Sequence, residues 1–211
     1  MEIYETEEQQ VDAIKSYWKK NGNAIIAGLV IGLSGFVGFN FYKEAELEKQ
    51  LAVSDAYQTL VESSETKPDG FIAAGEKFIA DNKDSSYATL TALTLAKQAA
   101  THKDWAQVEK YLTTAIESSK DEGMKAIATL RLARVQIQLD KVDAALSTLA
   151  APLPKSFKSS IEEIKGDAYL LQDKKDLART SYQEAIAATP GNASQSLQMK
   201  LDDLAENIVL K

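Results

Sequence analysis

The sequence contains no cysteine and only one histidine, His102, among its 211 residues. The lack of thiols excludes disulfides, thiolate nucleophiles and cysteine-based metal sites. His102 lies beside a predicted turn, where a solvated side chain is a simpler interpretation than a general base or a metal ligand. No other residues have the spacing of a catalytic or metal centre. We therefore expect a protein that is not an enzyme, with no cofactor and no evident small-molecule substrate.

Helix-breaking residues are also scarce, with four prolines and ten glycines in the whole chain. Four of the glycines lie inside one apolar run, and the remainder of the chain is rich in Ala, Leu, Lys, Glu and Gln, which favour helices. The composition therefore predicts an all-α fold. The net charge is −7, and no basic cluster falls on one helical face, so nucleic acid is not an expected partner.

The apolar run, AIIAGLVIGLSGFVGFNFY, covers residues 24–42 and contains no charged residue. As a helix it would be about 28 Å long, close to the hydrocarbon thickness of a bilayer. A cleaved signal peptide, one alternative, would have a shorter apolar core with small residues soon after it. Here Lys43, Glu44 and Glu46 follow directly. A buried core helix, the other alternative, would not need aromatic rings and lysines at both ends. We therefore predict a retained transmembrane helix over residues 23–43.

This helix divides the chain into three predicted parts. Residues 1–22 form a cytoplasmic tail with a short amphipathic helix, and residues 44–211 form the folded domain. Basic residues near a span favour the cytoplasmic side. Three precede the span and two follow it, so we expect a cytoplasmic N-terminus and, in a Gram-negative bacterium, a periplasmic domain; these residues are Lys15, Lys19, Lys20, Lys43 and Lys49.

Small residues form a stripe along the predicted span. Ala24, Gly28, Gly32 and Gly35 are separated by four, four and three positions, which places them on one helical face. Such a face lets another membrane helix approach closely. This stripe is our candidate membrane helix contact, although small residues are frequent in membrane helices for other reasons.

The folded domain contains internal repeats. The clearest one, residues 159–190, matches the tetratricopeptide signature in residue type and spacing, with small residues facing large ones and a final proline; the matching residues are Gly166, Tyr169, Ala178, Tyr182, Ala185 and Pro190. The equivalent small residues Ala96, Ala133 and Gly166 are 37 and 33 positions apart. These spacings bracket the period of about 34 residues that is typical of the repeat. We therefore expect tetratricopeptide-like helical hairpins, an α-solenoid.

Both ends of the repeat array depart from the pattern. Residues 45–62 and 70–80 read as a degenerate first pair of helices. After the last repeat, one apolar stripe predicts a C-terminal capping helix that covers the bare end of the stack, although the stripe could instead bind another protein; its residues are Leu197, Leu201, Leu204 and Ile208.

The first helix of each pair lines the concave side of such a stack. The predicted lining is a candidate partner groove, apolar toward its start and acidic toward its end, suited to a segment of another protein. It consists of Leu90, Leu93, Lys97, Ile127, Leu130, Arg134, Ile137, Glu163, Asp167 and Leu170. An alternative interpretation places Leu90, Leu93 and Leu130 in the core.

Four stretches of the chain resemble the YfgM family, ancillary subunits of the bacterial SecYEG translocon. They are MEIYETEEQQVDAIKSYWKKNG, the single span, LRLARVQIQLDKVDAALSTL and LQMKLDDLAENI. The resemblance implies a protein of the bacterial inner membrane with a periplasmic tetratricopeptide-like domain. It also implies two partners, the SecYEG translocon and a membrane-anchored periplasmic chaperone of the prolyl isomerase class. It implies no catalytic residue.

The leading hypothesis is therefore a membrane-anchored adaptor that links protein translocation to periplasmic chaperones. An alternative is a membrane-anchored regulator of a stress-signalling protein, acting through the acidic cytoplasmic tail that contains Glu2, Glu5, Glu7 and Glu8.

Overall fold

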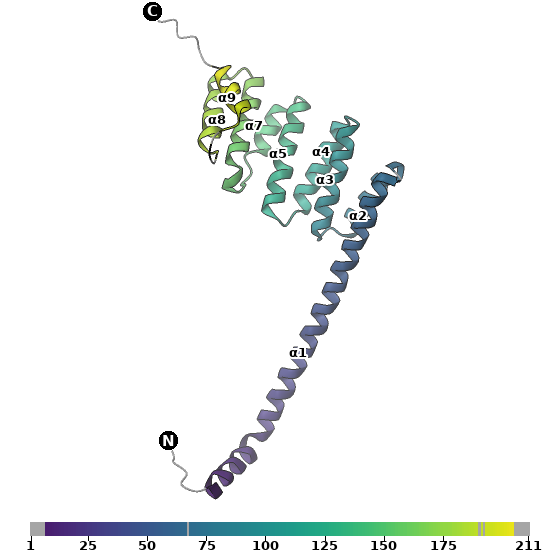
Figure 1. Ribbon diagram of the computed structural model, residues 1–211, viewed down its shortest axis with the longest axis vertical. Helices are drawn as coiled ribbons and strands as arrows, with labels where there is room; N and C mark the ends of the chain where they lie inside the picture. The colour runs from purple at the N-terminus through teal and green to yellow at the C-terminus, as the bar shows by residue number, and fades with distance from the viewer. Residues whose placement is uncertain (1–6, 67, 190, 192, 205–211) are drawn as a thin grey trace, which may run out of the picture. The chain divides into compact units, whose positions relative to one another are not determined.

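The computed structural model describes residues 7–66, 68–189, 191 and 193–204, with the side chains of residues 64–69 excepted (Figure 1). Pro190, Ile208, Glu2 and Glu5 lie outside these residues. Within the described residues every regular element is a helix, so the expected all-α fold is confirmed. The contacts divide the chain into two compact units, residues 1–52 and 53–211.

The helices follow one another along the chain as α1 (Glu7–Thr66), α2 (Pro68–Asp81), α3 (Ser86–Thr101), α4 (Trp105–Ser118), α5 (Glu122–Gln138), α6 (Val142–Thr148), the 3-10 helix η1 (Lys155–Phe157), α7 (Lys158–Leu171), α8 (Lys175–Ala187) and α9 (Gln195–Asp202).

The first unit consists of the N-terminal part of α1. The predicted amphipathic segment and the predicted span belong to this one helix, because no proline interrupts the chain between them. An 18-residue window of α1 has a mean hydropathy of 2.0, and none of it is buried. A core helix of a soluble protein would be mostly buried, so this exposure is what a membrane-spanning helix requires.

The second unit consists of helical hairpins that follow one another in chain order (Figure 1). Helices α3 and α4, α5 and α6, and α7 and α8 pair in the three predicted repeats. Each pair turns through one residue with positive φ: Lys103 (60°), Asp140 (59°) and Asp173 (55°). These residues are again 37 and 33 positions apart, so the turn lies seven residues after the small residue of each repeat.

The three turns also share one backbone hydrogen bond. The amide after the positive-φ residue donates to a carbonyl five residues back, as Asp104 does to Ala99 at 3.0 Å. Lys141 and Lys174 make the same bond at 2.8 and 2.9 Å. This pattern satisfies a carbonyl at the end of the first helix and reverses the chain. The hairpin is thus encoded locally in each repeat.

Side chains fix where several helices begin. Ser85, Asp104, Asp121 and Ser194 accept hydrogen bonds from backbone amides in the first turns of α3, α4, α5 and α9. Such caps satisfy donors that the helix itself leaves unpaired.

Small residues let the paired helices approach closely. A Cβ atom on Gly166 of α7 would lie 2.3 Å from the Cε1 atom of Tyr182 on α8, which is shorter than any van der Waals contact. Tyr182 is only 1% exposed. The glycine and the large ring therefore fit each other, as the repeat signature predicts.

The C-terminal part of α1 belongs to the second unit from Val53 onward. The Tyr57 ring packs against the rings of Phe78 and Tyr87, with centroids 6.2 and 5.0 Å away, and the Tyr87 hydroxyl donates to Ser54 at 2.9 Å. This segment and α2 thereby form the opening part of the repeat array.

At the other end, α9 packs on the last repeat. Leu197 and Leu204 are buried against Ala178, Tyr182 and Ala185 of α8. Three of the four residues of the predicted stripe, Leu197, Leu201 and Leu204, thus pack on the face that the last hairpin would otherwise leave bare.

Candidate protein-binding groove

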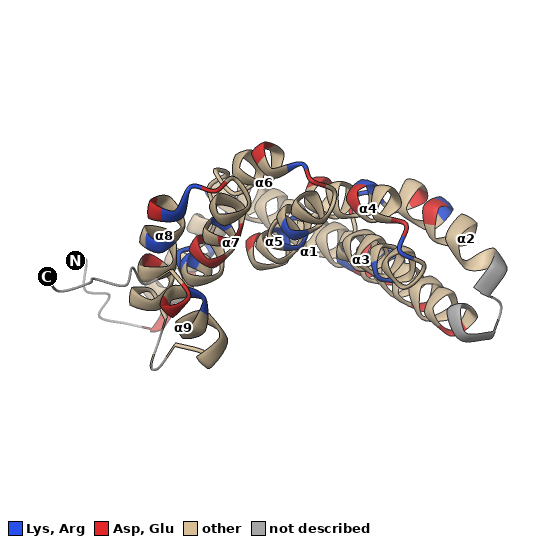
Figure 2. Ribbon diagram, turned by 90° about the horizontal axis from the view of Figure 1, so that it is seen from above, with Lys and Arg blue, Asp and Glu red and all other residues tan. Residues whose placement is uncertain are grey.

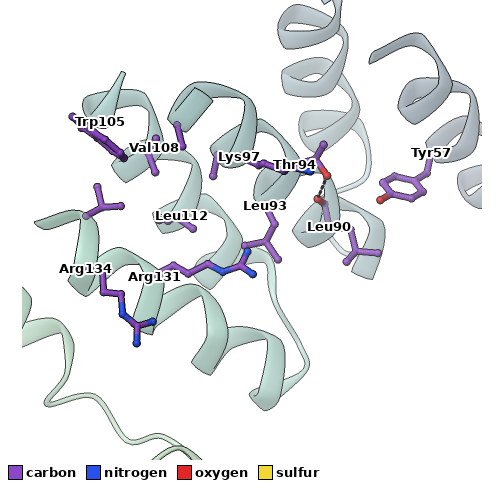
Figure 3. Close-up of a pocket in the computed structure, with 13 residues that line it drawn as sticks. Tyr57, Leu90, Leu93, Thr94, Lys97, Trp105, Val108, Leu112, Arg131 and Arg134 are labelled. Atoms are coloured by element: carbon purple, nitrogen blue, oxygen red, sulfur yellow. Dashed lines mark hydrogen bonds between the residues drawn. The ribbon is translucent and has the colours of Figure 1, made fainter. Parts of the chain in front are cut away.

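A groove of about 560 Å³ lies on the second unit where the first two clear repeats meet (Figure 3). One residue comes from α1, and the others come from α3, α4 and α5. The lining residues are Tyr57, Leu90, Leu93, Thr94, Ala96, Lys97, Ala100, Trp105, Val108, Leu112, Arg131, Arg134 and Val135.

The apolar part of the groove has a buried floor and half-exposed walls. Val108 and Leu112 are 3% and 2% exposed and hold α4 against its neighbours. Leu90, Leu93 and Trp105 are only partly buried, so their apolar surface remains open to solvent. The groove can therefore bury a large apolar side chain against a rigid base.

Three cations, Lys97, Arg131 and Arg134, border this apolar surface (Figure 3). Figure 2 shows basic residues, in blue, on α5, the helix that carries the two arginines. All three are exposed, and none makes an ion pair or a side-chain hydrogen bond within the described residues. The described lining also contains no aspartate or glutamate. The Arg131 side chain extends from α5 toward Leu93 of α3 (Figure 3). The groove thus combines open apolar surface with uncompensated positive charge.

Four of the ten residues predicted to line a partner groove, namely Leu90, Leu93, Lys97 and Arg134, meet in this one. Leu130 is instead 6% exposed in a core cluster around Ile164. Leu130 is therefore a core residue, as the alternative interpretation proposed. Ile127 and Ile137 are half-buried, and Ile137 packs against the same cluster.

Glu163 and Asp167, the predicted acidic end of the lining, lie in an intramolecular network. Lys200 of α9 donates to Glu163 at 2.8 Å and to Asp167 at 2.9 Å. The Tyr182 hydroxyl also donates to Asp167, at 2.8 Å. Both carboxylates are therefore paired with the same cation of the cap. Leu170 lies one turn beyond and is 41% exposed.

This network shifts two pKa values. Burial, followed by the hydrogen bond to Asp167, raises the pKa of Tyr182 well above its ordinary value. Burial alone would lower the pKa of Lys200, but the bonds to Asp167 and Glu163 outweigh it and raise that pKa. Lys200 thus stays charged and Tyr182 stays neutral at physiological pH.

A second polar network joins α2 to α4. Glu76 accepts hydrogen bonds from Lys110 at 2.8 Å and Tyr111 at 3.0 Å. The bond from Lys110, and then that from Tyr111, lower the pKa of Glu76. Burial, together with the bond to Glu76, raises the pKa of Tyr111 to about 12. These bonds fix the neighbouring helices and leave the groove open.

Sequence reasoning missed Arg131, Trp105 and Tyr57 as lining residues. Arg131 lies three positions before Arg134 and therefore shares its helical face, a signal that the sequence does contain. Trp105 lies on α4, the second helix of its pair, and Tyr57 lies on α1, in the degenerate first pair. Only tertiary packing brings them to the surface that α3 and α5 form.

The candidate membrane helix contact lies on α1. Gly28, Gly32 and Gly35 have no atom within 4 Å of an added Cβ, and Ala24 is exposed. The stripe is thus open along the described helix, and its contact with another membrane helix stays a prediction.

The repeat geometry and the exposed apolar helix define the class of protein: a tetratricopeptide-like repeat protein whose described residues include a candidate membrane span. The sequence matches the tetratricopeptide repeat-like domain family over residues 15–206.

Relatives that match almost the whole chain identify the family within this class. The chain is 35% identical to the ancillary SecYEG translocon subunit of Escherichia coli (strain K12), across 97% of this chain and 100% of the relative. Proteins of the same name from Haemophilus influenzae and Neisseria gonorrhoeae are 32% and 30% identical, each across 94% of this chain and 97% of the relative. The chain belongs to the family of ancillary SecYEG translocon subunits. This family is non-enzymatic, so the chain is not an enzyme.

Proposed function

We propose that the apolar part of α1 anchors this protein in the bacterial inner membrane, where it associates with the SecYEG translocon. The observation that carries the proposal is the similarity across 97% of the chain to a protein named as a subunit of that translocon. The exposed apolar window of α1 supports the anchor. The open stripe of Ala24, Gly28, Gly32 and Gly35 offers a surface for a helix of the translocon.

In the proposed topology the N-terminus lies in the cytoplasm and the repeat domain in the periplasm. The excess of lysine before the span supports this orientation. Protease added to spheroplasts should digest the domain while a cytoplasmic marker stays intact. Protection of the domain until the inner membrane is lysed would reverse the orientation.

The domain then acts as an adaptor. Its groove would hold a segment of an emerging chain or of a membrane-anchored periplasmic chaperone of the prolyl isomerase class. Anchoring near the translocon raises the effective concentration of such segments, so a weak groove suffices.

The association can be tested with the tagged full chain. Cells are crosslinked, membranes are solubilised in mild detergent, and SecY, SecE, SecG and periplasmic prolyl isomerases are quantified by mass spectrometry. We expect the translocon subunits and one membrane-anchored isomerase in the eluate. Recovery of neither would contradict the proposal.

Variants of the span locate the contact. Gly28→Leu with Gly32→Leu should reduce recovery of the translocon about tenfold if the stripe binds a neighbouring helix. The matched control is Ala27→Leu with Ser34→Leu, because both positions lie at least about 100° around the helix from Gly28 and Gly32. Equal recovery from both variants would place the contact elsewhere.

The alternative function, regulation of a stress-signalling protein through the cytoplasmic tail, predicts a different result. Deleting residues 2–10 should leave recovery of the translocon intact under our proposal. If the deletion abolishes the cellular phenotype of the protein while recovery persists, the regulator hypothesis is favoured.

A further inference from the structure

The groove on α3, α4 and α5 differs from the rest of the repeat array in its charge. Elsewhere in the described repeat array, several lysines pair with a carboxylate of another helix, as Lys110 does with Glu76, Lys141 with Glu109 and Lys200 with Glu163. In the groove Lys97, Arg131 and Arg134 face solvent without a carboxylate, in a protein whose net charge is −7. The groove is therefore a local cluster of positive charge on an acidic molecule.

Arg131 and Arg134 are also three residues apart on α5, where like charges repel. A partner that supplies carboxylates would relieve this repulsion. It would also gain planar, bidentate hydrogen bonds from the guanidinium groups.

Apolar surface adjoins these cations. Leu93 and Trp105 are half-buried over the floor formed by Val108 and Leu112. The volume of about 560 Å³ accommodates a few side chains. An occupant must therefore present apolar and acidic groups side by side, a combination that a protein segment offers.

We propose that this groove binds a segment of another protein in which a large apolar side chain is flanked by aspartate or glutamate. The proposal rests on the adaptor role described above and specifies the chemistry of its ligand. The apolar side chain packs against Leu93 and Trp105, and the carboxylates pair with Lys97, Arg131 and Arg134.

Four synthetic peptides of one length test this directly with the full chain in detergent micelles. The first carries leucine and phenylalanine flanked by glutamate, the second replaces glutamate with glutamine, the third replaces it with lysine, and the fourth is acidic with serine in place of the apolar residues. Trp18→Phe leaves Trp105 as the only tryptophan, so its fluorescence reports occupation of the groove. Fluorescence anisotropy of labelled peptides gives the affinities.

The acidic apolar peptide should bind about tenfold more tightly than the glutamine peptide, an increment that two or three exposed ion pairs supply together. Its association rate should fall as salt is added. The lysine and serine peptides should bind more weakly still, and Trp105 emission should change only when peptide binds. The proposal would be overturned if the acidic and basic peptides bound with equal affinity, or if the association rate did not change with salt. Neither result depends on a variant of the groove.

A variant with reversed charge in the groove provides a second test. In the variant with Arg131→Glu and Arg134→Glu, the affinity for the acidic peptide should fall at least tenfold, and the affinity for the lysine peptide should rise. The control, Lys155→Glu with Lys174→Glu, makes the same change in net charge on exposed lysines outside the groove and should leave the affinities unchanged. Equal effects of the two double variants would show a response to net charge alone and overturn the proposal.

If the groove binds something other than such a segment, the binding experiments give different results. Binding to vesicles of anionic phospholipid that the acidic peptide does not displace would assign the groove to a membrane surface. Self-association that Arg131→Glu abolishes, without peptide binding, would assign it to a second copy. Both results contradict the proposal.

The outcome is separable from that of the adaptor hypothesis, because the groove variants leave the span unchanged. If the charge-reversed protein still recovers SecY and no peptide preference exists, the inference fails while the proposed association stands. If the peptides bind selectively but no translocon subunit is recovered, the association fails instead.

Discussion

The first two clear repeats and the last one are built from the same helical hairpin, but they leave their surfaces in opposite states. Around α3, α4 and α5, apolar side chains and three cations face solvent. At the last repeat, α9 covers the apolar face of α8, and Lys200 pairs with both Glu163 and Asp167. We name these regions the open end and the capped end.

This difference shows that the repeat signature sets the backbone but not the use of its surface. Small and large residues at fixed spacing produce the hairpin at both ends. A charged residue of the lining is available to a partner only if no later helix supplies a counter-charge, as α9 does with Lys200. At the capped end the structure satisfies its own charges, which stabilises the fold. At the open end it leaves them unsatisfied, which favours binding.

The largest expected difference concerns Tyr182, in the core of the capped end. Tyr182→Ala removes a ring that is 1% exposed and leaves a cavity beside Gly166. We expect the free energy of unfolding to fall by about 3–5 kcal/mol, in urea titrations of the full chain followed by circular dichroism. The control, Leu171→Ala on the same hairpin, removes a side chain that is 61% exposed and should change it by less than about 0.5 kcal/mol. Equal losses would contradict the packing described.

A smaller effect should follow from filling the space that Gly166 leaves. Gly166→Ala places a methyl group 2.3 Å from the Tyr182 ring, which cannot retreat because it is buried and bonded to Asp167. Strain outweighs the gain in helix propensity, and the loss should be about 1–3 kcal/mol. Gly70→Ala on α2, where a Cβ meets nothing within 4 Å, should instead stabilise the protein by about 0.5–1 kcal/mol. A neutral result for Gly166→Ala would show that the helices do not approach so closely.

The polar network of the capped end should contribute less, and in a pH-dependent way. Lys200→Met removes two charge-assisted bonds between partly exposed groups, and screening by solvent limits the loss to about 1 kcal/mol. The folded-state pKa values of Lys200 and Tyr182 are both raised. Their contribution is therefore fully present below the unfolded values near 10, and it is lost as the pH rises through the folded values.

Thermal unfolding at several alkaline pH values tests this sign. The midpoint of the wild type should be steady up to about pH 9 and fall above it. The slope should be shallower in a Tyr182→Phe, Lys200→Met variant, although Tyr111 maintains part of it because its pKa is also raised, to about 12. A steeper fall in the double variant would contradict the assignment.

The smallest effect on stability should come from the open end. Arg131→Gln with Arg134→Gln removes no ion pair or side-chain hydrogen bond among the described residues and relieves a repulsion, so the free energy of unfolding should change by less than about 0.5 kcal/mol. Binding of an acidic apolar peptide should nevertheless weaken severalfold. A large loss of stability would mean that these arginines serve the fold, and the comparison between the two ends would fail.

Local patterns predicted the hairpins and the apolar helix, because each depends on residues close in sequence. Gly166, Ala178 and Tyr182 encode one pair, and the charge-free run over residues 24–42 encodes the exposed part of α1. The repeat spacing also placed Leu93 and Lys97 on the face that forms the groove.

The pairing of charges could not be predicted in the same way. Lys200 and Glu163 are 37 residues apart, and only the packing of α9 on the last repeat brings them together. Leu130 and Leu93 fall on similar register positions, yet α7 and α6 cover Leu130 while Leu93 remains half-exposed. The groove is thus shorter than the predicted lining, because tertiary contacts close its second half.

Photocrosslinking at two positions tests the contrast between the ends most directly. A photoreactive amino acid replaces either Leu93 in the groove or Leu170 at the capped end, in the otherwise unchanged full chain, and a labelled acidic apolar peptide is added before illumination. The peptide should attach at position 93 and compete with its unlabelled form, with little attachment at position 170. Equal or stronger attachment at position 170 would contradict the account, since the predicted lining would then bind along its whole length.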